Sequence, residues 1–248
     1  MSQSAADWHY PAWIAHRGAG KLAPENTLAA LRFGAEHGYR MFECDVKLSQ
    51  DGVPFLMHDA TLERTTNGAG IGGDCNWAAL SQLDAGSWHS RRYAGEPLPS
   101  LENIARFCLA NGHLLNIEIK PTPGHARMTG TTVAQHAARL WKSAAVAPLL
   151  TSFEVAALEA AQLAQPELPR GLLLDAPTSG WIETALRLGC VAIVCNHRLW
   201  DASSVLQAHS AGFRCLSYTV NEASAAQRLL ALGIDGIITD RVDLFPPA

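Results

Sequence analysis

The chain has 248 residues, of which 48% are hydrophobic and 17% charged, so it can bury a large core and lacks the composition of a disordered protein. Its net charge of −4 disfavours a nucleic acid or an anionic membrane surface as a partner, because both need clustered Lys and Arg. The length is typical of one α/β barrel, so we expect residues 1–248 to form a single domain.

Segments that would direct the chain to a membrane are not expected. The first ten residues include Asp7 but no Lys or Arg before an apolar run, so we predict no secretory signal. No stretch of about 18 uninterrupted apolar residues occurs, so no transmembrane helix is predicted. The six cysteines form no C-x-x-C pair and are expected to be buried thiols. We therefore predict a cytoplasmic protein without stable membrane association.

Strands and helices alternate along the chain. Residues 13–16 form a short apolar run, and a helix follows from Thr27 to about His37, with Asn26 predicted as its N-cap and Gly38 as its C-cap. The second strand spans residues 40–48. Further strands are predicted at 114–119, 148–152, 171–174, 191–195, 214–220 and 234–239, and further helices at 101–110, 131–145, 154–165, 179–188, 202–211 and 223–232.

This alternation predicts a parallel sheet with helices packed around it. Eight such strands favour closure into a TIM (β/α)8 barrel over a doubly wound open sheet. The barrel is preferred because candidate functional residues stand at the C-terminal ends of several different strands, where barrel active sites lie.

One further strand, at residues 53–58, follows the second strand too closely for a parallel crossover. Asp51-Gly52 predicts a type I′ hairpin, and pairing Gln50 with Val53 would set Asp45 opposite His58. Residues 59–100 then lack periodicity and are rich in glycine. We expect them to form a small inserted subdomain over the barrel mouth, which could shape the pocket or act as a lid.

Three carboxylates are predicted to face the same region. Because side chains alternate along a strand, Glu43 points with Asp45, and Glu118 points with Lys120. One acid could be balanced by an ion pair with Arg17 or another base. Three buried acids on two strands favour a divalent cation, and oxygen ligands suit Mg²⁺ or Ca²⁺ better than zinc, for which no H-x-H or H-E-x-x-H pattern occurs.

Two histidines and two cationic side chains accompany these acids. His16 and His58 follow strands and are candidates for proton transfer, since imidazole can take and give protons near neutral pH. Either one alone could equally be a polar residue at a strand end. Arg17 and Lys120 can neutralise phosphate oxygens as well as balance the acids. The set predicts a metal-dependent phosphodiesterase.

The order of these residues along the chain resembles one family closely. The matching segments are His16-Arg17-Gly18, Pro24-Glu25-Asn26-Thr27, Glu43-x-Asp45-Val46, Asp51-Gly52, His58-Asp59, Leu62-x-Arg64-Thr65-Thr66-Asn67-Gly68, Glu118-x-Lys120 and Gly236-Ile237-Ile238-Thr239-Asp240-Arg241. The chain resembles the glycerophosphodiester phosphodiesterases, most of all cytoplasmic bacterial members, and the resemblance runs almost from end to end.

The resemblance implies a TIM barrel with an inserted subdomain, metal ligation by Glu43, Asp45 and Glu118, and His16 and His58 as acid and base. It implies hydrolysis of small glycerophosphodiesters, such as glycerophosphocholine, to sn-glycerol 3-phosphate and an alcohol. It also implies attack by the neighbouring glycerol hydroxyl, which would give a cyclic phosphate that water opens. Many members carry Trp where this chain has Tyr218, so Tyr218 is expected to line the substrate pocket or simply to pack in the core.

Two other functions stay open at this point. A phospholipase C or D acting on intact lipid would need a membrane-docking surface, and the sequence contains no basic amphipathic helix of that kind. A non-catalytic barrel is disfavoured because the candidate acids and histidines are all present. The oligomeric state, the choice between Mg²⁺ and Ca²⁺ and the roles of the individual histidines are not predicted.

Overall fold

The computed structural model describes residues 8–176, 178–245 and 247, and these form a closed barrel. The sheet has nine strands in the order β1-β9-β8-β7-β6-β5-β4-β2-β3, and β1 also pairs with β2, which closes the ring. All strands run parallel except β3, which pairs antiparallel with β2 outside the ring. Their bounds are β1 (Trp13–Ala15), β2 (Met41–Leu48), β3 (Pro54–Leu56), β4 (Leu114–Ile119), β5 (Leu149–Ser152), β6 (Arg170–Leu174), β7 (Ala192–Asn196), β8 (Arg214–Tyr218) and β9 (Gly236–Thr239).

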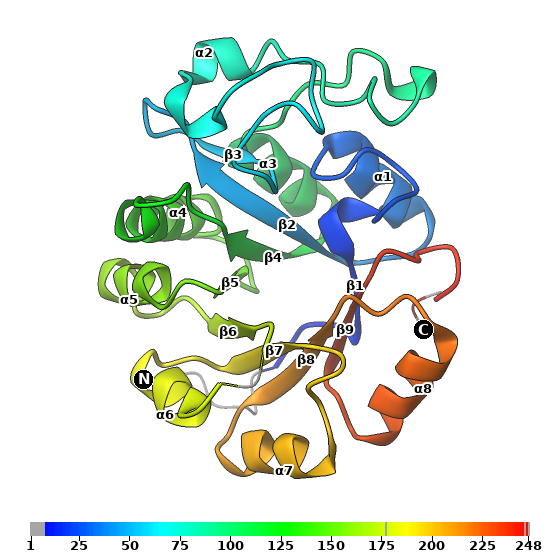
Figure 1. The fold of residues 1–248 in the computed structure, drawn as a ribbon, viewed down its shortest axis with the longest axis vertical. Coiled ribbons are helices and arrows are strands. Elements are labelled where there is room, and N and C mark those ends of the chain that lie inside the picture. The colour runs from blue at the N-terminus through cyan, green and yellow to red at the C-terminus, as the bar shows by residue number, and fades with distance from the viewer. Residues whose placement is uncertain (1–7, 177, 246, 248) are drawn as a thin grey trace.

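Helices surround these strands, with the segment that contains α2 at the upper edge of the view (Figure 1). The predicted TIM barrel is therefore confirmed. The helices are α1 (Leu28–Glu36), α2 (Trp77–Leu80), α3 (Leu101–Asn111), α4 (Ala126–Leu140), α5 (Val155–Ala164), α6 (Trp181–Arg187), α7 (Ala202–Ser210) and α8 (Ala223–Ala231).

Alternation along the strands separates the two sides of the barrel wall. Outward residues of β2 and β4, such as Phe42, Cys44 and Ile117, are buried against the helices. Inward residues at the N-terminal ends, such as Met41 and Ile14, fill the base of the barrel. The inward positions that follow Met41 along β2 are charged, so the interior changes from apolar at the base to charged at the mouth.

Two local predictions about α1 and α4 were wrong. Thr27, not Asn26, caps α1, because its hydroxyl accepts a hydrogen bond from the Ala30 amide. Helix α4 begins at Ala126, five residues before the predicted start at 131. Gly130 lies inside α4 because a Cβ atom at this position would lie only 2.1 Å from the carbonyl oxygen of Ala157 on α5.

The β2–β3 hairpin forms as predicted, but with a different turn and register. Ser49, not Gln50, bonds to Val53, so the loop is one residue longer than a type I′ turn. Only Gly52 in this loop has a positive φ, 80°. In the strand ladder that follows, Val46 pairs with Leu56. The backbone carbonyl of Asp45 then accepts a hydrogen bond from the Met57 amide, so Asp45 does not lie opposite His58. His58 therefore follows the end of the ladder.

Residues 59–100 pack with the hairpin around a small core distinct from the barrel core. Its buried members are Phe55 and Met57 from the hairpin and Leu62, Leu80, Ala85 and Leu98 from the segment. Two hydrogen bonds join the segment to the hairpin loop. The Gln50 amide donates to the Cys75 carbonyl, and the Trp77 amide donates to the Asp51 carboxylate. On its other side, Glu96 accepts a bond from the Ala29 amide at the start of α1. The segment is thus attached to the barrel at more than one edge.

Two further expectations concern cysteines and membrane spans. All six cysteines are free. Five are buried, as predicted, but Cys75 is only half-buried. None of the helices formed by the described residues is long and apolar enough to cross a membrane. Residues 1–7, which contain most of the segment on which the prediction of no secretory signal rests, lie outside the described part of the chain.

Candidate active site

Two neighbouring strands bring three carboxylates together at the barrel mouth. Parallel pairing sets Asp45 on β2 beside Glu118 on β4, and Glu43 lies two residues before Asp45 on the same inward face. One oxygen from each of the three lies within 4.8 Å of the others. Glu43 and Asp45 are only 3% and 1% exposed, so water screens the repulsion between their charges only weakly.

This carboxylate cluster fits a divalent cation. Burial and the neighbouring charge of Asp45 raise the pKa of Glu43. Glu43 Oε1 is buried and accepts no hydrogen bond from the described residues. An unpaired buried carboxylate oxygen is costly unless a cation binds it. Three oxygen donors are also the ligand type that Mg²⁺ and Ca²⁺ prefer.

Arg17 lies next to the cluster because of a tight turn after β1. Its backbone is left-handed, with φ of 50°, and its amide donates to Glu43 Oε2 at 3.0 Å. Its guanidinium donates to Glu25 at 2.8 Å and lies 3.3 Å from Asp45 Oδ2. Glu25, which lies outside the carboxylate cluster, therefore holds the Arg17 side chain.

Lys120 approaches the cluster from the end of β4. Its ammonium group donates to Glu118 Oε1 at 2.7 Å and lies 3.5 Å from Asp45 Oδ1. It also lies 5.5 Å from the centre of the Phe153 ring, within the range of a cation–π contact. Arg17 and Lys120 thus partly neutralise the acids and still line the cavity.

His16 has a carboxylate partner on each side. Its Nδ1 is 2.6 Å from Asp240 Oδ1, and its Nε2 is 3.8 Å from Glu43 Oε2. Burial opposes the charged imidazolium, but the hydrogen bond to Asp240 and the charge of Glu43 outweigh it and raise the pKa of His16. Asp240 is itself held by the Asn221 side-chain amide at 2.8 Å.

His58 has one carboxylate partner, and its electrostatic surroundings differ. Its Nδ1 is 2.6 Å from Asp59 Oδ1, which leaves Nε2 for the cavity. Burial, supported by the positive charges of Arg17 and Lys120, lowers the pKa of His58 more than the nearby acids raise it. Both histidines are therefore held through Nδ1, but their surroundings raise the pKa of His16 and lower the pKa of His58.

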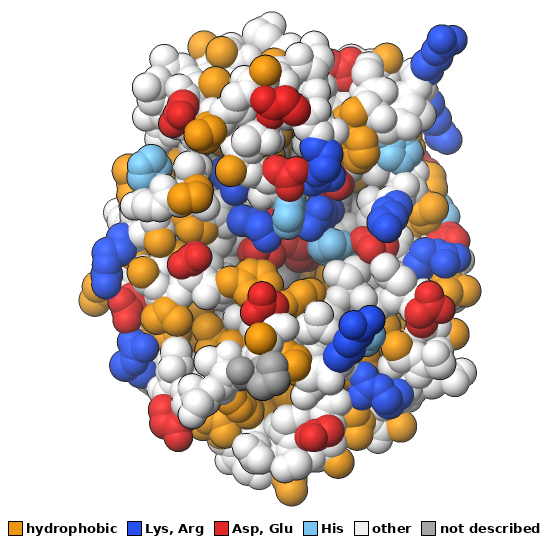
Figure 2. Space-filling model, in the orientation of Figure 1, with side chains coloured by type: hydrophobic (Ala, Val, Ile, Leu, Met, Phe, Trp, Pro, Cys, Tyr) orange, Lys and Arg blue, Asp and Glu red, His pale blue; other side chains and the backbone are white. Residues whose placement is uncertain are grey.

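These groups line a cavity of about 150 Å³ at the mouth of the barrel. Figure 2 shows acidic, basic and histidine side chains gathered in a hollow at the middle of this face. Seven of the eight predicted site residues line the cavity: His16, Arg17, Glu43, His58, Glu118, Lys120 and Tyr218. Asp45 is the exception and lies buried beside them. The Tyr218 hydroxyl donates its proton to the Leu174 carbonyl at 2.9 Å, which fixes the side chain at the wall of the cavity.

Several residues of the site were not assigned a role from the sequence. Asn26 is buried, donates to Asp45 Oδ2 at 2.8 Å and accepts from the Asp45 amide at 3.0 Å. Asp240 orients His16, and Phe153 packs edge-on against Tyr218 with ring centres 5.8 Å apart. The sequence did carry a signal for Asn26 and Asp240, because both lie in segments that match the family.

Comparison with known proteins agrees with this geometry. Residues 16–244 match the model of the glycerophosphoryl diester phosphodiesterase family. A glycerophosphodiester phosphodiesterase of Caldanaerobacter subterraneus is 31% identical over 231 residues, which cover 92% of this chain and 93% of the relative.

Solved structures agree as well. An Oleispira antarctica phosphodiesterase, solved in complex with the product sn-glycerol-3-phosphate, superposes with a TM-score of 0.88 at 35% identity and covers 96% of each chain. A glycerophosphodiester phosphodiesterase of Agrobacterium tumefaciens superposes with a TM-score of 0.81 at 26% identity, covering 96% of this chain and 99% of the other. The resemblance noted in the sequence is confirmed, and the chain belongs to the glycerophosphoryl diester phosphodiesterase family.

Proposed function

We propose that the protein hydrolyses small glycerophosphodiesters, such as glycerophosphocholine and glycerophosphoethanolamine, to sn-glycerol 3-phosphate and an alcohol. One observation carries the proposal: a cluster of three carboxylates lies at one small cavity at the barrel mouth, which is also lined by two histidines and two cationic side chains. Family membership and the product bound to the Oleispira antarctica structure support the same substrate class. No membrane-docking surface is needed for such substrates.

In this proposal Glu43, Asp45 and Glu118 hold Mg²⁺ or Ca²⁺. The bound cation would stabilise negative charge on the phosphate oxygens. Arg17 and Lys120 bind the remaining phosphate oxygens, Arg17 through a guanidinium already anchored by Glu25. The Tyr218 ring forms part of the wall that contacts the substrate.

His16 and His58 move the protons. One imidazole Nε2 takes the proton from the attacking oxygen as the new P–O bond forms, and the other gives a proton to the alkoxide oxygen as its bond to phosphorus breaks. Asp240 and Asp59 hold the Nδ1 atoms, so each Nε2 keeps a fixed direction. The attacking group in the first step is the neighbouring 2-hydroxyl of glycerol, and water opens the resulting cyclic phosphate in a second step.

We also propose that residues 1–248 form one catalytic domain with residues 59–100 as an inserted subdomain. The small core that this segment forms with the hairpin, distinct from the barrel core, supports this division. The free thiols support a reducing, cytoplasmic location.

The substrate class can be tested directly. The protein is incubated with glycerophosphocholine or with phosphatidylcholine vesicles, each with Mg²⁺ or Ca²⁺ and each with EDTA, and sn-glycerol 3-phosphate, phosphatidic acid and phosphocholine are assayed. Sn-glycerol 3-phosphate from the soluble diester alone, lost in EDTA, is the expected result. Turnover of the vesicles alone would identify a phospholipase, and no turnover by folded, cation-loaded protein would overturn the proposal. A diester without the 2-hydroxyl should be cleaved much more slowly; normal cleavage would exclude internal attack.

The assigned roles make a second prediction. His16→Ala and His58→Ala should each lose about 100- to 10,000-fold in kcat, the range that positioned acids and bases contribute, and still bind the cation. Glu43→Ala should lose cation affinity as measured by titration calorimetry. The same pattern in all three variants would contradict the separation of proton transfer from metal binding.

A further inference from the structure

Arg64 lies in the inserted segment and links two carboxylates that belong to the site. Its Nη1 and Nη2 donate to the two oxygens of Glu25, both at 2.8 Å. Its Nε donates to Asp59 Oδ2, and its Nη2 also donates to Asp59 Oδ1 at 3.1 Å. All three nitrogens of the guanidinium are therefore used, in the two-pronged geometry that fixes carboxylates most firmly.

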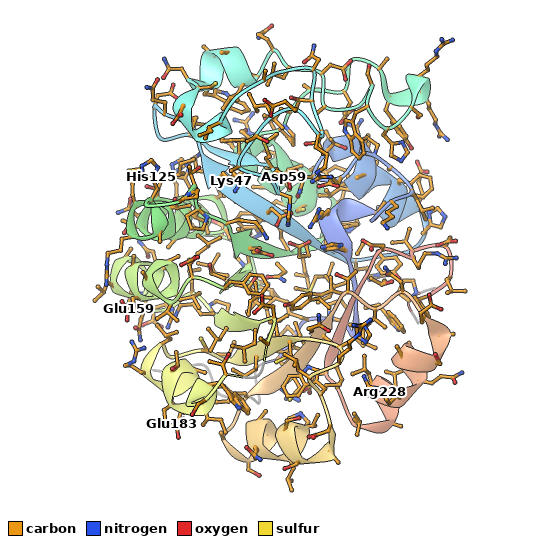
Figure 3. All side chains as sticks on the ribbon, viewed as in Figure 1. Lys47, Asp59, His125, Glu159, Glu183 and Arg228 are labelled. Atoms are coloured by element: carbon orange, nitrogen blue, oxygen red, sulfur yellow. The ribbon has the colours of Figure 1, made fainter. Side chains whose placement is uncertain are left out.

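Each of these carboxylates holds one group of the proposed chemistry. Asp59 binds the Nδ1 of His58, and Glu25 binds the guanidinium of Arg17. His58 comes from the end of the hairpin and Arg17 from the turn after β1, so no backbone element connects them directly. Arg64 connects them through two short hydrogen-bonded chains. Figure 3 labels Asp59 where the barrel meets the inserted segment.

The other histidine is held without such a link. Asp240, the partner of His16, is fixed by the neutral side chain of Asn221. Asp59, the partner of His58, is fixed by the positively charged guanidinium of Arg64. The hydrogen bond from Arg64 lowers the pKa of Asp59 and keeps the carboxylate charged. Asp59 is also more exposed than Asp240, with 29% against 13% of its side chain accessible, so it depends more on a second partner to keep its orientation.

We propose that Arg64 is a positioning residue that sets His58 and Arg17 relative to one another, so that the inserted segment contributes to turnover without touching the substrate. The inference rests on the proposed function, because it assigns His58 to proton transfer and Arg17 to phosphate binding. Loss of Arg64 frees both Asp59 and Glu25 and lets both site groups move.

The three residues of this link should affect different kinetic constants. Asp59→Asn should mainly lower kcat, because the amide holds the imidazole of His58 less well. Glu25→Gln should mainly raise KM, because it loosens Arg17. Arg64→Ala should do both, with kcat lower by about 10- to 100-fold, the usual cost of losing a residue that orients a functional group. A residue with a purely structural role would lower the melting temperature and leave KM unchanged.

The test measures kcat and KM for glycerophosphocholine in the wild type and in Arg64→Ala, Arg64→Lys, Asp59→Asn, Glu25→Gln and the double variant Arg64→Ala/Asp59→Asn. Arg64→Lys should recover only part of the activity, since one ammonium group cannot fork to two carboxylates. The double variant should be no slower than the slower single variant, because both changes break the same chain. Arg187→Ala is the control: it removes an exposed ion pair to Glu159 on α5, away from the mouth (Figure 3), and should leave both constants unchanged.

The outcomes separate the two proposals. An inactive wild type would overturn the proposed function. With an active wild type, normal kcat and KM in Arg64→Ala, or strictly additive losses in the double variant, would overturn the role of Arg64. If Arg64→Ala does not fold, Arg64→Lys and Asp59→Asn decide: normal constants in both overturn the inference, and a loss in kcat with an unchanged melting temperature supports it.

Discussion

Asn26 is one of two described non-glycine residues with a left-handed backbone, with φ of 58°, and the other is Arg17. Such a conformation costs about 1–3 kcal/mol for most residues and persists where the surroundings require it. Here it aims the Asn26 side chain at Asp45, where the amide both donates and accepts a hydrogen bond. The bond to Oδ2 leaves Oδ1 of Asp45 for other partners.

Replacement of this amide should weaken cation binding. Asn26→Gly keeps the left-handed backbone at little cost but releases Asp45, and we expect cation affinity to fall by about 10- to 100-fold. Titration calorimetry with Mg²⁺ and Ca²⁺ measures the change. Asn111→Gly, an exposed site at the end of α3, should bind the cation as the wild type does. Unchanged affinity in Asn26→Gly would mean that Asp45 needs no support from Asn26.

For single residues, the sequence predicts where the clustered carboxylates lie better than it predicts the hydrogen-bond partners of the site residues. The alternation of side chains along a strand is enough to put Glu43, Asp45 and Glu118 on one face. The pairing of His16 with Asp240 spans 224 positions in the chain, so no local pattern reveals it. The sequence predicts Asn26 as a helix cap because Asn suits that position, and its long-range bond to Asp45 depends on the closed barrel.

Among the elements, α1 is packed closely against the turn that carries His16 and Arg17. A Cβ on Gly34 would lie 2.3 Å from the Gly18 carbonyl oxygen and 2.9 Å from the Phe42 ring. Gly34→Ala should therefore push the turn away from α1, at a cost of about 1–3 kcal/mol in stability. Since small displacements of catalytic groups can cost about 100-fold in rate, kcat should fall sharply. Denaturant unfolding and steady-state kinetics measure both effects.

A second helix offers the matched control. In Gly130→Ala the new Cβ would lie 2.1 Å from the Ala157 carbonyl oxygen, at the contact between α4 and α5. We expect a similar loss of stability with kcat unchanged, because this contact carries no group of the site. Equal losses of kcat in both variants would show that stability alone, and not the position of the turn, limits activity.

The order and type of the strands and helices can be predicted from the sequence, but the strand register of the hairpin cannot. Strand and helix periods are local, so the sequence predicts most of the strands and helices of the barrel to within a few residues. The register of β2 and β3 depends on the turn, and Asp51-Gly52 suits more than one turn type. Asp51 accepts hydrogen bonds from Ser49 and from Trp77, which favours the longer loop, and the second of these contacts comes from the inserted segment.

For the whole molecule, the buried acids predict that a cation stabilises the fold. Binding to the native state alone adds about 2.7 kcal/mol at a cation concentration 100 times Kd. For a domain of this size that corresponds to a rise of about 5–10 °C in melting temperature. Differential scanning calorimetry in EDTA and in saturating Mg²⁺ or Ca²⁺ measures it.

Glu43→Gln tests whether the carboxylate cluster is responsible. The variant removes one buried charge and should lose the cation-dependent rise. Its melting temperature in EDTA should be no lower than that of the wild type, because the burial and repulsion that raise the pKa of Glu43 are relieved. A full cation-dependent rise in Glu43→Gln would place the cation elsewhere.

The distribution of the thiols gives the natural sequence a built-in labelling site. Cys75 is the one cysteine of the six that is not buried, and its carbonyl takes part in the junction between the inserted segment and the hairpin. A thiol-reactive fluorophore or spin label should therefore modify the folded protein at a single position, without any engineered cysteine. Because Cys75 lies at the junction between the inserted segment and the hairpin, a label there would report directly on movement of the segment relative to the barrel.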